Sequence, residues 1–336
     1  MKKEIIYMCL FLAMLGGLAR AQSKVGTTAA NFLKIPVGSR ASAMGSAFTA
    51  VANDASAAFW NPGGLARLTG NELIASNTKW LVETNHYWFG LAFKIEDNSC
   101  IGISVNQLDY GEEDITTPEE PDGTGQKWEA RDIAIGLSYS QNLTDRFSIG
   151  GTVKYIQQKI WNETATAYAL DIGLLFTTQL NGLRIGMNIA NFGTEMQMDG
   201  KDLLQPVDID PVRTGNNETI VATLKTKTWT LPLTFTVGLG MEAYENGPWK
   251  WTVSTDAVYP NSQTSYLNAG TEITWNKLIS LRAGYFSLFK ESAEEGLTAG
   301  VGLQYDLGQF MIKADYSYSD FGIFDDISRY SISVGF

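Results

Sequence analysis

Residue types that carry catalysis are scarce in this chain of 336 residues. His86 is the single histidine, in the sequence Asn85-His86-Tyr87-Trp88, so a catalytic dyad or triad based on histidine would have to use it. Its place at the start of an alternating segment favours a polar residue in an interfacial girdle instead. No cysteines and histidines have the spacing of a zinc site. We therefore expect neither an enzyme nor a bound cofactor or metal.

Acidic residues gather in residues 112–122 and in the pair Asp208 and Asp210. Such carboxylates could bind Ca²⁺, but they lack the spacing and the glycine of an EF-hand loop, so a solvated loop is the better interpretation. Gly300 and Gly302 lie within an alternating segment, which does not suit a phosphate-binding loop. None of these groups predicts a site.

The chain begins with the pattern of a secretory signal peptide over residues 1–21. The basic pair Lys2-Lys3 precedes a nearly continuous apolar run in residues 5–18, and Ala19-Arg20-Ala21 has the form of a cleavage site. The run is shorter than the roughly 20 residues that a membrane-spanning helix needs. We expect cleavage after Ala21 and export of the mature chain to the outer membrane.

Cysteine content and charge limit the partners. Cleavage would remove Cys9 and leave Cys100 alone, so no internal disulfide can form. The chain has 25 Lys+Arg and 36 Asp+Glu, a net charge of −11. Nucleic-acid binding needs a basic patch, so we expect no nucleic-acid partner.

From residue 72 onward apolar and polar residues alternate, as in strands with two chemically different faces. Every second residue from Trp229 to Met241 is apolar, and residues 297–306 repeat the pattern. We predict fourteen strands, over residues 72–80, 85–95, 100–109, 128–140, 147–160, 165–178, 183–193, 229–243, 249–259, 265–275, 278–288, 296–307, 309–318 and 328–336.

Strand length and loop length together predict the architecture. Most segments have about ten residues, which suits a tilted strand crossing a bilayer. The joins between strands alternate between two kinds. The short ones are residues 96–99, 141–146, 179–182, 244–248, 276–277 and 308. The alternate joins include the long, polar stretches 110–127, 194–228, 289–295 and 319–327. We predict an all-β fold: a 14-stranded antiparallel transmembrane β-barrel over residues 72–336, with both termini on the short-turn, periplasmic side.

The apolar face of each strand should meet lipid, because a closed barrel leaves no unpaired backbone edge there. An Arg or Lys facing the bilayer midplane costs about 2–4 kcal/mol, so charged residues should line the lumen. These are Asp132, Lys154, Asp171, Arg184, Asp256, Glu272, Arg282, Asp306, Lys313 and Asp315. Aromatic residues near strand ends suit interfacial girdles or, alternatively, core packing: Trp80, Tyr87, Trp88, Trp128, Trp161, Trp229, Trp249, Trp251, Tyr266 and Trp275.

Residues 22–71 do not alternate. Small residues dominate residues 37–47, which permits close packing in a confined space. Residues 50–60 predict a short helix capped by Asn53 or Asp54, which the following Asn-Pro-Gly-Gly should end. A segment of this kind ahead of a barrel is well placed to fold back as a plug. Arg40 and Arg67 could pair with lumen carboxylates.

These residues resemble the N-terminal hatch signature of FadL-like outer-membrane barrels, a family with fourteen strands. The motif consists of Gly38, Arg40, Met44, Gly45, Asn53, Asp54, Trp60, Asn61, Pro62, Gly63 and Gly64. Within that superfamily the chain looks most like the PorV/PorQ family, through residues 23–30, Asp171-Ile172-Gly173 and residues 256–260. The resemblance extends over essentially the whole mature chain. One departure is Asn-Pro-Gly-Gly where the superfamily usually has Asn-Pro-Ala-Gly, which should affect the fold only mildly.

The resemblance implies a part in type IX protein secretion. Barrels of this family bind the C-terminal signal domain of secreted cargo and deliver it to a cell-surface attachment complex. Secreted cargo and other secretion subunits are therefore the expected partners besides outer-membrane lipid. Residues 110–127 and 194–228 would form the binding surface, because loops on a rigid scaffold commonly carry binding. FadL-like transport of hydrophobic small molecules is the alternative, which the polar lumen disfavours; a purely structural outer-membrane protein is a third.

Overall fold

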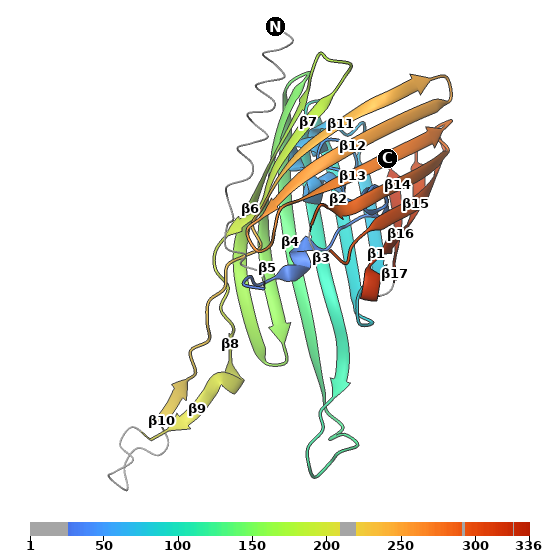
Figure 1. Cartoon of the computed structure of the whole chain (residues 1–336). Coiled ribbons are helices and arrows are strands. Elements are labelled where there is room, and N and C mark those ends of the chain that lie inside the picture. The colour runs from blue at the N-terminus through green and yellow to red at the C-terminus, as the bar shows by residue number, and fades with distance from the viewer. Residues whose placement is uncertain (1–25, 209–219, 291–292, 325) are drawn as a thin grey trace.

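The computed structural model describes residues 26–208, 220–290, 293–324 and 326–336. The expected signal peptide lies outside them. Within the described residues fourteen strands form one closed antiparallel barrel (Figure 1). They are β1 (Glu72–Lys79), β2 (Asn85–Glu96), β3 (Ser99–Asp114), β4 (Lys127–Thr144), β5 (Phe147–Ile160), β6 (Glu163–Thr177), β7 (Arg184–Gly193), β11 (Thr234–Asn246), β12 (Trp249–Pro260), β13 (Tyr266–Trp275), β14 (Ile279–Leu288), β15 (Leu297–Asp306), β16 (Met311–Asp320) and β17 (Asp326–Gly335).

The barrel closes where the first and last strands meet. β1 pairs with β2 on one side and with β17 on the other, in a register that places Glu72 opposite Gly335 and Thr78 opposite Arg329. β7 pairs with β11 across the long connection between them. Each of the fourteen strands therefore has two neighbours, which satisfies the backbone hydrogen bonds that lipid cannot.

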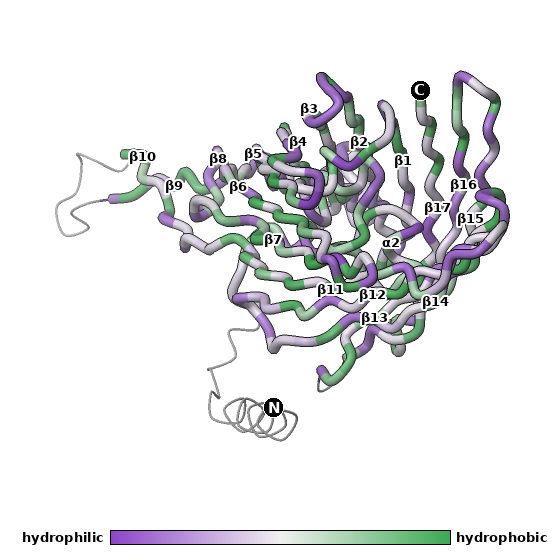
Figure 2. The backbone as a smooth tube through the Cα atoms, turned by 90° about the horizontal axis from the view of Figure 1, so that it is seen from above, coloured by the Kyte–Doolittle hydropathy of each residue, from purple (hydrophilic) through white to green (hydrophobic). Residues whose placement is uncertain are grey.

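The two faces of the strands differ as the alternation predicts. Leu137 on β4 and Val153 on β5 each expose 59% of their surface on the outside. Their neighbours Ser138 and Thr152 point inward, are buried, and share a 2.8 Å hydrogen bond between hydroxyl groups. Figure 2 shows this alternation of apolar and polar residues along the strands. An exposed apolar band of this kind is stable against lipid.

The two ends of the barrel differ in their connections. At one end, the short-turn end, the joins are residues 97–98, 145–146, 178–183, 247–248, 276–278 and 307–310. The opposite end, the long-loop end, carries residues 115–126, 194–233 and 289–296 among its connections. The β3–β4 connection and the segment with β8 to β10 project from the same end of the barrel (Figure 1).

Three strand predictions were wrong in their bounds. β3 and β4 are longer than predicted, because their ladder continues to Asp114 opposite Lys127, so the irregular loop is shorter than residues 110–127. β11 begins at Thr234 and not at residue 229. Pro232 has no N–H to continue a ladder, and Leu231 is buried in the interior although its apolar character suggested a lipid-facing position.

The N-terminal segment, residues 26–71, is packed against the inner face of the barrel (Figure 1). It contains η1 (Asn31–Lys34), α2 (Ser39–Ala43), α3 (Ala57–Trp60) and η2 (Pro62–Arg67). The remaining helices are η3 (Lys201–Leu203) and η4 (Gly322–Phe324). Among the described residues, every helix is too short or too polar to cross a membrane.

The segment runs the length of the interior. Near its start the N–H of Ala29 donates to the carbonyl of Thr230, at the long-loop end, over 3.0 Å. It leaves at the short-turn end, where Asn71 and Phe336 exchange backbone hydrogen bonds of 3.1 and 3.0 Å. The C-terminus therefore lies at the short-turn end as predicted, whereas the first described residues lie at the opposite end.

Candidate functional site

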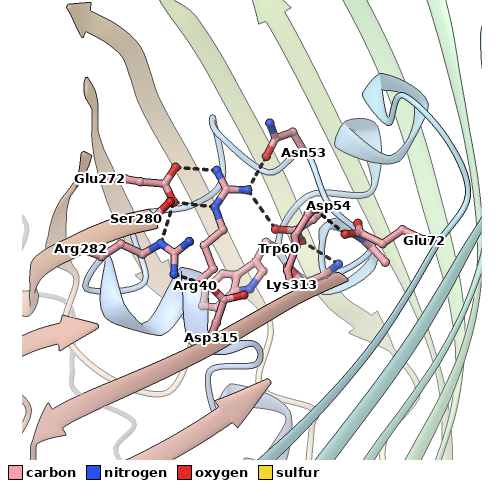
Figure 3. A network of polar contacts seen from close by, with 12 residues as sticks. Arg40, Asn53, Asp54, Trp60, Glu72, Glu272, Ser280, Arg282, Lys313 and Asp315 are labelled. Carbon is pink, nitrogen blue, oxygen red and sulfur yellow. Dashed lines mark hydrogen bonds and ion pairs between the residues drawn. The ribbon is translucent and has the colours of Figure 1, made fainter. Parts of the chain in front are cut away.

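An ion-pair network joins the N-terminal segment to the barrel wall (Figure 3). Arg40 of α2 donates from Nε to Oε2 of Glu272 over 2.9 Å and from Nη2 to Oε1 over 2.8 Å, a two-pronged contact with β13. Arg282 of β14 donates from Nε to the same Glu272 over 2.7 Å and from Nη1 to Asp315 of β16 over 2.5 Å. Two arginines and two carboxylates thus connect α2 to the strands β13, β14 and β16, which confirms the pairing expected of Arg40.

Arg40 also organises its own segment. Its Nη1 donates to Oδ1 of Asn53 over 2.6 Å and to Oδ2 of Asp54 over 3.1 Å. Burial opposes the charge of the guanidinium, but Glu272 and then Asp54 outweigh burial and raise the pKa of Arg40 above its ordinary value. Arg40 therefore remains charged at any physiological pH.

A second link uses Glu72, the first residue of β1, which the sequence analysis did not single out. Its Oε2 accepts from the backbone N–H of Ala55 over 2.8 Å, and its Oε1 accepts from Nζ of Lys313 on β16 over 2.7 Å. Glu72 is the inward residue at the start of an alternating strand, which is the signal that could have identified it.

The expected helix over residues 50–60 is shorter than predicted. Oδ1 of Asp54 accepts from the backbone N–H of Ser56 over 3.0 Å, so the chain turns here and α3 begins only at Ala57. Asn61 ends α3 in extended backbone, as predicted for this motif, and caps η2 by accepting from the N–H of Gly63.

Asn61 and Asp256 fasten the segment to two further strands of the wall, β6 and β12. Nδ2 of Asn61, fully buried, donates to the carbonyls of Thr49 over 2.8 Å and of Leu174 on β6 over 2.9 Å. Oδ2 of Asp256 on β12 accepts from the backbone N–H groups of Phe48 and Thr49 over 3.0 and 2.9 Å. Buried polar groups of the segment are thus matched by inward side chains of the barrel.

Strand glycines allow the backbone of the segment to approach the wall. A Cβ on Gly150 of β5 would collide with the carbonyl of Pro62, and one on Gly284 of β14 with the backbone of Met44 and Gly45. Gly45 itself has a φ of 61° and is enclosed by backbone atoms of Ala269 and Tyr285, so glycine is required there for both reasons. The inward glycines therefore make room for the segment.

The residues predicted to line the lumen differ in how deeply they are buried. Asp132, Lys154, Asp171, Asp256, Glu272 and Arg282 are buried in the interior, and Arg184, Lys313 and Asp315 are half-buried there. Nζ of Lys154 lies 2.5 Å from Oδ2 of Asp171, and Asp132 accepts from Tyr110 and Gln158. Asp306 is different: it is exposed and accepts from the N–H of Gly308 in the turn after β15.

Three individual predictions were wrong. Among the described residues Arg67 forms no ion pair with a carboxylate; it donates to the hydroxyl of Ser148 and to the backbone carbonyl of Asp145. His86 is no girdle residue, because it is buried on the inner face of β2 with Nε2 2.6 Å from Oδ1 of Asn106. Trp88 follows two residues later on the same face and is buried for the same reason.

The other aromatic predictions divide between the girdle and the interior. Trp249, Trp251 and Trp275 are exposed together at the short-turn end, as a girdle requires. Trp80 and Tyr266 are half-buried at the long-loop end, against Phe321 and Phe286 respectively. Core packing, the alternative, therefore holds for these two.

The long connection between β7 and β11 builds a projecting hairpin. β8 (Asp199–Gly200) pairs with the start of β6, at Glu163 and Thr164, and β9 (Leu204–Val207) pairs with β10 (Ile220–Thr223) in a separate two-stranded sheet. Its base is held by backbone hydrogen bonds of 2.8 and 2.9 Å between Met196 and Trp229. Leu204, Val221 and Leu224 expose about half of their surface or more. Asp210 of the acidic pair lies outside the described residues.

Several cavities border the N-terminal segment, and two of them are large enough or apolar enough to consider as sites. One, of about 370 Å³, opens at the short-turn end and is lined by charged residues that include Arg40, Lys277 and Lys313. The other, of about 90 Å³, lies between the segment and the wall and is lined by Leu33, Trp60 and Phe286 among others. Within the part of the chain that the structure describes, no group of three or more His, Cys, Asp or Glu side chains could hold a metal ion.

Comparisons with known proteins agree with this architecture. Among solved structures the chain is similar to the CymD monoaromatic hydrocarbon channel, with a TM-score of 0.56 and 11% identity over 89% of this chain and 96% of that one. It is also similar to the toluene transporter TodX of Pseudomonas putida, with a TM-score of 0.53 and 14% identity over 89% of this chain and 96% of that one. Likeness at these identities concerns the fold alone.

A comparison with curated proteins gave no match. A comparison with protein families matches residues 18–210 to the family described as Type IX secretion system protein PorV. That range contains more than half of the chain, including the N-terminal segment and β1 to β7. The chain therefore belongs to the PorV family of type IX secretion system proteins and is an outer-membrane β-barrel.

Proposed function

We propose that this barrel binds secreted cargo or partner subunits of the type IX system at the cell surface, through the β3–β4 connection and residues 194–228. The observation that carries the proposal is the β9–β10 hairpin, which stands away from the barrel (Figure 1). A family that handles secreted proteins needs a surface outside the membrane that a protein can contact, and the hairpin offers one.

The hairpin has the chemistry of a binding element. A two-stranded ribbon is only marginally stable in water by itself, and it leaves backbone groups on its outer edges unpaired. Partner proteins often bind by adding a strand to such an edge, while side chains beside it give specificity. Exposed Val221 and Leu224 would supply apolar contacts, and the Met196–Trp229 base would hold the hairpin in place.

The test is recovery of partners by the full chain purified from its own cells after crosslinking. We expect Val221→Asp combined with Leu224→Asp to reduce recovery of secreted proteins and secretion subunits at least tenfold, as measured by mass spectrometry. Ile323→Asp is the matched control, because Ile323 is equally apolar and 78% exposed in η4 at the same end. Unchanged recovery with the double variant, or a wild-type preparation that contains lipid alone, would contradict the proposal.

We infer further that residues 22–71 act as a plug, held by the charged residues lining the lumen, and that residues 1–21 are a cleaved signal peptide. The burial of residues 37–66 between the strands supports the first inference. A single-channel recording tests it: the wild-type barrel should show little ion conductance, and a chain whose segment is displaced should conduct. An N-terminal sequence of the mature protein that begins at Gln22 would support the second inference, and one that retains Met1 would refute it.

Transport of hydrophobic small molecules remains the second candidate, because the similar structures are a hydrocarbon channel and a toluene transporter. The β6–β7 ladder shifts register between Leu170 and Ile172, close to the cavity of about 90 Å³. That cavity is small beside the roughly 300–1,000 Å³ of typical ligand sites. Saturable toluene binding that Val258→Trp abolishes by filling the cavity would favour transport, whereas no binding would leave secretion as the function.

A further inference from the structure

Arg329 of β17 is a buried cation that has no carboxylate partner among the described residues. Its side chain is on the inner face of the barrel and only 2% of its surface is exposed. Nε donates to the hydroxyl of Thr78 over 2.7 Å. Among the residues that the structure describes, this is the one hydrogen bond of the guanidinium, and no carboxylate lies within 4.0 Å of it.

The other interior arginines show how unusual this is. Arg282 is also almost fully buried, but it has Glu272 and Asp315 at 2.7 and 2.5 Å. Arg40 is less buried and has Glu272 and Asp54. An arginine has only donors and keeps its charge, so burial without a counter-charge is strongly unfavourable. A second component should therefore compensate Arg329.

Arg329 lines a small cavity between α2 and the barrel wall. The cavity has about 20 Å³ of free volume and is also lined by Pro36, Ser42 and Phe321. This volume exceeds the roughly 10–15 Å³ that one water-sized species needs. The cavity therefore has room for one small guest and none for a large one.

Two further donors without partners face this region. The hydroxyl of Ser42, on α2, lines the cavity and is buried without a hydrogen bond. The hydroxyl of Ser317, on β16, is likewise buried and unpartnered, and Ser317 lies directly opposite Arg329 in the strand register. A cation from β17 and a hydroxyl donor from α2 thus line the cavity, and a second hydroxyl donor, on β16, lies beside Arg329 in the sheet.

We propose that this cavity binds one small monovalent anion, of the size of chloride or formate. A bound water could accept hydrogen bonds but would leave the charge of Arg329 uncompensated. Glu295, which pairs with Lys290 at 3.4 Å, and Asp320 also line the cavity, and their negative charges oppose a dianion such as sulfate more strongly than a monoanion. The anion would contact Ser42 of the N-terminal segment and Arg329 of the barrel, and so would join the two.

Thermal unfolding of the full mature chain in detergent tests the proposal. The protein is exchanged into sodium gluconate, whose anion is too large for the cavity, and chloride, bromide, formate or sulfate replaces it at constant ionic strength. We expect a saturable rise of roughly 3 °C with chloride, bromide and formate, because a ligand that binds the folded state stabilises it. Arg329→Gln should remove the rise.

Arg184→Gln is the matched control, because Arg184 is an interior arginine that already has Glu242 at 2.8 Å; it should keep the rise. If Arg329→Gln does not fold, bromide-soaked crystals of the wild-type chain decide the question through an anomalous peak beside Nη1 and Nη2 of Arg329. An equal rise in Arg329→Gln, an equal rise with sulfate, or density for water alone at Arg329 would overturn the proposal.

Discussion

Arg40 of the N-terminal segment and Glu272 of β13 form a two-pronged ion pair, 2.9 and 2.8 Å long, although 232 residues separate them in the chain. A planar guanidinium and a carboxylate fit each other in this geometry, which is more specific than a contact between point charges. The pair fixes α2 against one part of the barrel wall, and Asn61 fixes the end of α3 against another.

Removing Arg40 should loosen the segment. Arg40→Gln leaves Glu272 with Arg282 alone and should lower the free energy of unfolding by about 2–3 kcal/mol, because one partner of a largely buried pair is lost. Thermal or urea unfolding in detergent measures this. Arg131→Gln is the control, since its pair with Glu129 is exposed and should contribute less than about 1 kcal/mol. Equal losses of unfolding free energy for the two substitutions would show that the interior ion pair stabilises the protein no more than the exposed one.

Neighbouring glycines of β5 provide a steric test. Gly150→Ala places a Cβ against the carbonyl of Pro62, whereas Gly151→Ala meets only a carbonyl of the adjacent strand at 3.4 Å. We expect Gly150→Ala to displace η2 and raise single-channel conductance, while Gly151→Ala behaves like the wild type. Similar conductance in both variants would argue that the segment does not block the lumen.

Asn61 should contribute strongly to the stability with which the N-terminal segment is packed in the barrel. Asn61→Ala removes both Nδ2 hydrogen bonds and leaves the carbonyls of Thr49 and Leu174 buried without that donor, which costs about 1–3 kcal/mol for each group left unsatisfied. Asn53→Ala is the comparison, because exposed Asn53 accepts a single bond from Arg40. Protease cleavage within residues 37–66 should become faster in Asn61→Ala and change little in Asn53→Ala.

The prediction that the outer face meets lipid can be tested with arginine substitutions at two different depths in the bilayer. Leu137→Arg, near the middle of the outer face of β4, should cost about 2–4 kcal/mol, and Ile95→Arg, at the end of β2, about 0–1 kcal/mol. Both residues are more than half exposed on the outside, so they differ mainly in their distance from the membrane centre. Refolding into lipid vesicles, followed by urea unfolding, gives the two values. A small cost at Leu137 would contradict its place in the bilayer.

Much of the barrel was predictable because strand alternation is a local property. A side chain that meets lipid must be apolar and its neighbour need not be, so the sequence records the two faces directly. The prediction failed at residues 229–233, where Leu231 is apolar because it packs in the interior, and at Trp88 for the same reason. Both lipid and a protein core select apolar residues, and the sequence pattern does not distinguish them.

The sequence by itself determined that the chain is a two-faced β-barrel, and residues 38–64 predicted an N-terminal segment suited to packing inside it. Only the tertiary structure decided which groups meet there: Arg40 with Glu272, Ala55 with Glu72, and Arg67 with Ser148. Contacts of this kind depend on strand register and on the path of the segment through the lumen, which arise when distant parts of the chain close into one cylinder. The surroundings of Arg329, which include no described carboxylate within ion-pair distance, are likewise a property of the folded barrel that the sequence pattern does not reveal.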